Sequence, residues 1–227
     1  MVQRALIEQR PWLLASLVAG IGYYFMAGTA LPDLYEWAVK GAGVAFLAVY
    51  ALVGHSGRDS RQIALIMALG ALGDVLIELS LQAGAAAFLV GHLIAIHLYL
   101  RHHRAVLSPS QKLAGLTLFV LTPLIAFLLP ADRSAAPGVA LYAAGLGAMT
   151  AAAWSSTFSR YRVGIGAVMF AISDLLIFAR MGALSDSILP DLLIWPLYYF
   201  GQFLICIGVV GEVRQRASAT NGLARAL

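Results

Sequence analysis

The chain has 227 residues, of which 61% are hydrophobic and 11% are charged, and its mean hydropathy is +0.84. Soluble domains carry about 25% charged residues, so this composition excludes a soluble globular domain and predicts an integral membrane protein. Repeated apolar runs of nearly 20 residues favour helices over the alternating strands of a barrel.

The expected fold is all-α, a polytopic membrane protein built as a single bundle of eight transmembrane helices over residues 1–227. Pro-Asp turns, polar loops and basic clusters separate the apolar runs and set the expected boundaries. In chain order, the expected spans cover residues 11–27, 34–53, 63–79, 83–100, 113–129, 138–154, 163–178 and 192–210. The polar tail from Glu212 onward is expected to be frayed.

Lys and Arg residues gather on one side of this expected bundle, where they predict orientation. That side holds Arg4, Arg10, Arg58, Arg61, Arg101, Arg104, Lys112, Arg160, Arg162, Arg214, Arg216 and Arg225. The opposite side holds only Arg133 and, near a helix end, Arg180. The positive-inside rule therefore places both termini in the cytoplasm. It also explains the net charge of +4 as a topology signal beside the membrane, not as a sign of a nucleic-acid partner.

Two of the apolar runs carry carboxylates, which are the main functional signal in this sequence. Asp74 and Glu78 lie four residues apart, so a helix places them on one face. The run over 167–178 carries Ser173 and Asp174 in its middle. A charged side chain near the bilayer centre costs at least ~2.5–3.5 kcal/mol on insertion scales, so each group needs a partner, a proton or water. We interpret the two helices as facing each other around one polar site.

The expected depths of the polar residues agree with a shared site. At 1.5 Å rise per residue, Asp74 lies about 6 Å outward of the middle of its span, and Asp174 and Tyr198 about 3 Å outward. By the same rise, His92 and Gln202 fall within about 3 Å of the midplane. Overlapping depth is what a common cavity requires, although depth alone does not fix which way a side chain faces.

Structural explanations stand beside the functional ones. Asp74 could form a structural ion pair with Lys40, which lies in the same outer half, and Glu78 could be solvated at the headgroup boundary. His92 could be a hydrogen-bonded packing residue, and Ser173 could bond its own helix backbone. The glycines expected to allow close helix packing are Gly70, Gly73, Gly164, Gly166 and Gly201.

Four motifs in order resemble the YhhN family, whose characterised members are lysoplasmalogenases. They are GALGDVLIEL, GAAAFLVGH, GAVMFAISDLLI and PLYYFGQFLI, and the resemblance covers nearly the whole chain, including its size and its eight spans. The family pattern marks Lys40, Gly73, Asp74, Phe88, His92, Ser173, Asp174, Tyr198 and Gln202. The resemblance implies an ether-bond hydrolase of lipid metabolism, which cleaves the vinyl ether of a lysoplasmalogen to a fatty aldehyde and a glycerophospho-ethanolamine or -choline.

Acid-catalysed cleavage of a vinyl ether suits two carboxyls in unequal surroundings, one protonated and one ionised. We therefore expect Asp74 and Asp174 to be catalytic, with Asp174 as the proton donor and Asp74, nearer Lys40 in depth, as the ionised partner. Glu78 is expected to meet the ammonium of the head group, and Lys40 its phosphate. The full set of expected substrate-binding residues is Lys40, Glu78, His92, Ser173, Tyr198, Tyr199 and Gln202.

No cofactor or metal is expected, because only His92 and His97 lie within spans, short of the usual set of zinc ligands. The expected partners are the lysophospholipid substrate and membrane lipid, with no nucleic acid and no obligate protein partner, in a bacterial inner (plasma) membrane. Two other functions stay open at this point. A small proton-coupled transporter also uses intramembrane carboxyls and histidines, and a non-catalytic lipid-binding membrane protein would need the same cavity.

Overall fold

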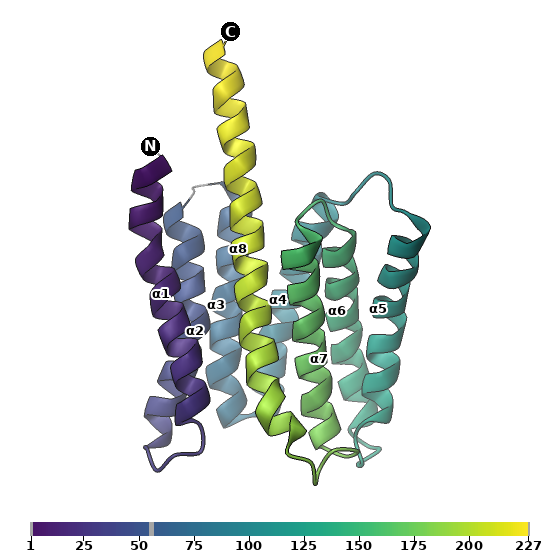
Figure 1. The fold of residues 1–227 in the computed structure, drawn as a ribbon. Helices are drawn as coiled ribbons and strands as arrows, with labels where there is room; N and C mark the ends of the chain where they lie inside the picture. The colour runs from purple at the N-terminus through teal and green to yellow at the C-terminus, as the bar shows by residue number, and fades with distance from the viewer. Residues whose placement is uncertain (1, 55–56, 227) are drawn as a thin grey trace.

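A computed structural model describes residues 2–54 and 57–226 and, within them, the side chains of residues 10–53 and 57–219. The described part is a bundle of helices that run up and down beside one another (Figure 1). The helices are α1 (Val2–Met26), α2 (Asp33–Gly54), α3 (Arg58–Leu79), α4 (Leu81–Arg101), α5 (Pro109–Leu128), α6 (Ala136–Ser155), α7 (Ile165–Arg180) and α8 (Leu189–Ala226), with a short π-helix η1 (Arg160–Gly164) before α7.

Seven helices of the described chain are long and apolar enough to cross a membrane, from α2 to α8, with η1 and α7 counted together. The protein is therefore an integral membrane protein. Helix α1 is not among the seven, so the count of eight spans stays a prediction. The exposed face of α1 nevertheless carries Leu14, Val18, Ile21 and Phe25 at helical spacing, an apolar stripe suited to lipid contact.

Serine side chains cap the starts of two helices. Ser80 ends α3, and its side-chain oxygen accepts a hydrogen bond from the amide of Ala83, so the same serine starts α4. Ser108 and Gln111 form a capping box at the start of α5, in which each side chain bonds the backbone of the other residue. These caps satisfy amides that a helix end leaves free, so they fix where the chain turns.

The last helix continues well past the expected boundary at residue 210. The expectation of a frayed tail from Glu212 is wrong, because α8 runs to residue 226 and rises above the rest of the bundle in Figure 1. Side chains hold the first part of this extension. The guanidinium of Arg214 lies 5.2 Å over the ring of Tyr50. Arg216 donates 2.9 Å to the hydroxyl of Thr157.

Helices α7 and α8 approach each other at two facing glycines. A Cβ atom added to Gly166 would lie 2.7 Å from the carbonyl oxygen of Gly201, and one added to Gly201 would lie 2.8 Å from that of Gly166. Both contacts are with backbone, which cannot rotate away. The sequence expectation that these two glycines permit close packing is confirmed, and the contact holds α7 close beside α8 next to Gln202.

Both chain ends lie at the same end of the bundle, the upper end in Figure 1. The lower end holds the α1–α2, α3–α4, α5–α6 and α7–α8 connections. By the bounds of their helices, Lys40, Glu78 and Arg180 lie toward this lower end. Asp59, which pairs with Arg101 and His102, lies at the upper end. The buried core runs through α2, α3, α4, α6, α7 and α8.

Candidate functional site

A cavity of about 900 Å³ opens among α1, α2, α3, α4, α7 and α8. It extends from Gly28 and Ile188, in the connections at the lower end of the bundle, inward to Phe88 and Tyr198. Its volume falls in the range of about 300–1,000 Å³ typical of ligand pockets. Asp74 and Asp174 both line it, so the structure brings the two buried carboxyls to one space.

Asp74 is held on the cavity wall by a tyrosine of α8. The hydroxyl of Tyr198 donates a hydrogen bond of 2.8 Å to Oδ2 of Asp74, and both side chains are buried. The ring of Phe88 packs edge-on against Tyr198, with the ring centroids 5.7 Å apart. That ring has room because residue 73 is glycine, where a Cβ atom would lie 2.8 Å from Phe88. Gly73 thus leaves room for Phe88, which packs on the tyrosine that bonds the neighbouring Asp74.

Asp174 is held by a tyrosine that the sequence analysis missed. The hydroxyl of Tyr142, on α6, donates a hydrogen bond of 2.6 Å to Oδ2 of Asp174. The same hydroxyl lies 3.2 Å from Nε2 of His92, on α4. A chain of hydrogen bonds therefore joins His92, Tyr142 and Asp174 across three helices. A signal was present, since Tyr142 carries the one phenol within the expected span 138–154.

Lys40 forms an ion pair with Glu78 at the cavity wall. The alternative in which Lys40 forms an ion pair with Asp74 is therefore wrong, because the partner of Lys40 is Glu78. The Lys40 side chain is 13% exposed and that of Glu78 is 31% exposed, so the pair is only partly open. One turn of α3 separates Glu78 from Asp74. The same side of the cavity therefore has one carboxylate in an ion pair and one that is bonded by a tyrosine.

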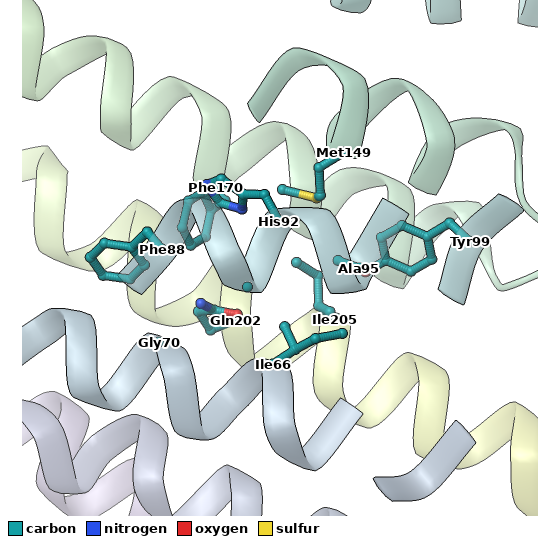
Figure 2. A pocket seen from close by; sticks show the side chains of 11 residues that line it. Ile66, Gly70, Phe88, His92, Ala95, Tyr99, Met149, Phe170, Gln202 and Ile205 are labelled. Carbon is teal, nitrogen blue, oxygen red and sulfur yellow. The ribbon is translucent and has the colours of Figure 1, made fainter. Parts of the chain in front are cut away.

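His92 and Gln202 line a second, much smaller void of about 20 Å³ above the main cavity. Figure 2 shows Phe88, Gln202 and Met149 around it. Phe88 belongs to the walls of both spaces, so the two spaces adjoin at this residue. A space of this size holds about one water molecule. The structure therefore sets His92 and Gln202 behind Phe88, not on the wall of the large cavity.

The remaining two expected site residues differ in their surroundings. Ser173 lines the main cavity, and its hydroxyl donates 2.9 Å to the carbonyl oxygen of Ile194 on α8, not to its own helix. Tyr199 lines neither space. Its hydroxyl lies 2.9 Å from that of Ser16, and its ring fills the place that a side chain at Gly20 would need. Tyr199 therefore fixes α1 against α8.

Within residues 2–54 and 57–226, no group of three or more His, Cys, Asp or Glu side chains is placed to hold a metal ion. The cavity wall holds two buried carboxyls, each bonded by a phenol, and two cations, each paired with a further carboxylate. Chemically, such a set can transfer a proton at one face of a bound molecule and stabilise a positive charge at the other.

One of the comparisons with known proteins finds a match, and it identifies a family. No curated protein and no solved structure matches the chain. The YhhN family model matches residues 35–209, which includes every charged residue that lines the main cavity, together with His92 and Gln202 of the small void. A match over most of the chain, together with the helical bundle that carries the motifs in the expected order, means that this protein belongs to the YhhN family.

Proposed function

We propose that the protein is a membrane-embedded hydrolase that cleaves the vinyl ether bond of a lysoplasmalogen. The products are a fatty aldehyde and a glycerophospho-ethanolamine or -choline. The observation that carries this proposal is the single cavity in which Asp74 and Asp174, each bonded by a tyrosine, share a wall with the Lys40–Glu78 ion pair. Membership in the YhhN family adds support, because it suggests a lysoplasmalogenase-like membrane protein.

The substrate fits the cavity by its chemistry. A lysoplasmalogen has one long apolar chain and one zwitterionic head group, and the cavity has apolar walls such as Ile77, Ile177 and Trp195 beside a cation and a carboxylate. In the proposed pose the phosphate meets Lys40 and the ammonium meets Glu78. The vinyl ether then lies further inward, between Asp74 and Asp174.

The reaction begins with transfer of a proton from a carboxyl to the β-carbon of the vinyl ether. This step converts the C=C–O unit into an oxocarbenium ion, which the second carboxylate stabilises. Water then adds to the oxocarbenium carbon and loses a proton to that carboxylate, giving a hemiacetal. Collapse of the hemiacetal breaks the carbon–oxygen bond, releases the aldehyde, and leaves the hydroxyl on the glycerol backbone.

The surroundings of the two carboxyls support Asp174 as the proton donor. Its hydrogen-bond partner is the neutral phenol of Tyr142, and none of the ion pairs in the described part of the chain includes it. Asp74 is in none of these ion pairs either, but it lies one turn from Glu78, on the wall where Lys40 supplies a positive charge, and this cation is the difference between the two carboxyls. In low dielectric, a nearby cation favours the ionised form and isolation favours the protonated form, which assigns Asp74 as the ionised partner.

The small void behind Phe88 supports a role for His92 and Gln202 in handling water. Both polar side chains face a space of about 20 Å³, which is enough for about one molecule of water. A water held there lies next to the large cavity, since Phe88 lines both spaces. This position suits the second step, in which water adds after proton transfer.

The test is aldehyde release from a pure lysoplasmalogen by the purified protein in detergent. Asp74→Asn and Asp174→Asn should each lower kcat by about 10²–10⁴, the usual contribution of a general acid or base. The double variant should lose far less than the product of the two, because the residues act as a unit. Asp132→Asn is the matched control, since this exposed aspartate lies in the α5–α6 connection and bonds Ser134.

The outcomes separate the proposal from its alternatives. Wild-type protein that binds the lipid without releasing aldehyde would be a lipid-binding protein. Uptake of substrate into proteoliposomes along a proton gradient, without cleavage, would identify a transporter. Near wild-type turnover in either single variant, with a melting curve like that of the wild type, would refute the pair of catalytic aspartates.

A further inference from the structure

A second ion pair lines the main cavity, and the proposed chemistry does not use it. Nη1 of Arg180, the last residue of α7, lies 3.2 Å from Oδ1 of Asp191, in the first turn of α8. Both residues belong to the cavity wall, together with Lys40 and Glu78. The cavity therefore has one ion pair on the α2–α3 side and another on the α7–α8 side.

The few cations at this end of the bundle make the second pair notable. In the described part of the chain, the lower end carries Lys40, Arg133 and Arg180. Arg133 is engaged elsewhere, because its Nη1 donates 2.8 Å to the carbonyl oxygen of Phe127 and its guanidinium lies 4.7 Å over the ring of that residue. Both other cations line the cavity.

A purely structural role explains only part of this arrangement. A cation suits the C-terminal end of α7 and a carboxylate suits the N-terminal end of α8, because of the helix dipoles. The side chains are, however, 54% and 64% exposed, and such exposed pairs contribute little to stability. The dipoles also give no reason for both charges to border the cavity that holds Lys40. An anion that enters the cavity can therefore displace Asp191 from Arg180 at little cost.

We propose that Arg180 is the second phosphate-binding residue of the cavity and that Asp191 holds it in place while the cavity is empty. The inference rests on the proposed function, and it extends the phosphate site beyond Lys40. The planar guanidinium binds two phosphate oxygens at once, whereas the ammonium of Lys40 acts as a point charge. The phosphate of a single-chain lipid then lies between Lys40 and Arg180, and its position fixes how far the chain enters toward Asp74 and Asp174.

The experiment measures the binding of 1-O-alkylglycerol 3-phosphate, which has the phosphate but no ammonium and no cleavable vinyl ether. Arg180→Ala should raise its Kd by about tenfold, the loss expected for one charge-assisted contact. Asp191→Asn should lower the Kd by about two- to threefold, because it removes a competing carboxylate whose exposed ion pair is weak. Neither variant should change the Kd of 1-O-alkylglycerol, which lacks the phosphate. Arg133→Ala is the matched control, and it should leave both Kd values unchanged.

Opposite signs for the two variants are the decisive result. A role for the pair in folding alone would weaken binding in both variants and would affect both lipids, and that outcome would overturn the proposal. An unchanged Kd in Arg180→Ala would overturn it as well. Because the probe is not cleaved, this result is independent of the aldehyde assay. A phosphate site can therefore be found even if the vinyl ether chemistry fails, and the chemistry can hold even if Arg180 is not a ligand.

Discussion

Tyr142→Phe is the most informative single change, because it removes one oxygen and leaves the ring. In the structure that oxygen donates a 2.6 Å hydrogen bond to Asp174 and lies 3.2 Å from Nε2 of His92. The ring packs edge-on against Phe178, with centroids 5.9 Å apart, and a phenylalanine keeps this contact. The variant therefore tests the hydrogen bonds and not the packing.

The expected magnitude follows from the burial of Asp174, which is 6% exposed. A buried acceptor that loses its donor costs about 1–3 kcal/mol. With about 1.4 kcal/mol for each factor of ten in rate, kcat/KM should fall by about 5- to 140-fold if Tyr142 positions Asp174 for proton transfer. KM should change little, since Tyr142 is absent from the cavity wall.

The assay is aldehyde release, with Tyr161→Phe as the control because that side chain is 82% exposed. The variant is also placed in the Asp174→Asn background. If Tyr142 acts through Asp174, the loss from Tyr142→Phe should nearly vanish there, because the two residues then work as one unit. A full additive loss in the double variant, or unchanged kcat/KM in the single one, would refute the reasoning.

Three further changes test the packing, the head-group site and the topology. Gly166→Ala should destabilise the protein by about 1–3 kcal/mol, since its Cβ would meet backbone at 2.7 Å, while Gly22→Ala, with open space, should not; melting in detergent compares them. Lys40→Ala should raise KM for lysoplasmalogen more than it lowers kcat, and the reverse pattern would move Lys40 into the chemistry. If both termini are cytoplasmic, Ser134→Cys should react with an impermeant thiol reagent outside intact cells and Ser218→Cys should not. The native Cys206 is buried and should add no background, and equal labelling of the two variants would contradict cytoplasmic termini.

The sequence by itself determined the class of protein and the approximate course of its helices. Apolar runs of membrane length and the one-sided Lys and Arg are properties of local composition, which a reader can count without coordinates. The i, i+4 spacing of Asp74 and Glu78 likewise fixed their common face. The same reasoning missed the extension of α8, because contacts of Arg214 and Arg216 with distant residues support it.

Only the tertiary structure decided which polar groups meet. Hydropathy gives the depth of a residue, but the rotation of a helix about its axis depends on its neighbours. For this reason Glu78, and not Asp74, is the partner of Lys40, and Tyr142 from α6 is the partner of Asp174. For the same reason the two adjacent tyrosines of α8 have different partners. Tyr198 forms a hydrogen bond with Asp74, and Tyr199 forms one with Ser16. The 100° between neighbouring positions of a helix sends them to different helices, and only packing selects which ones.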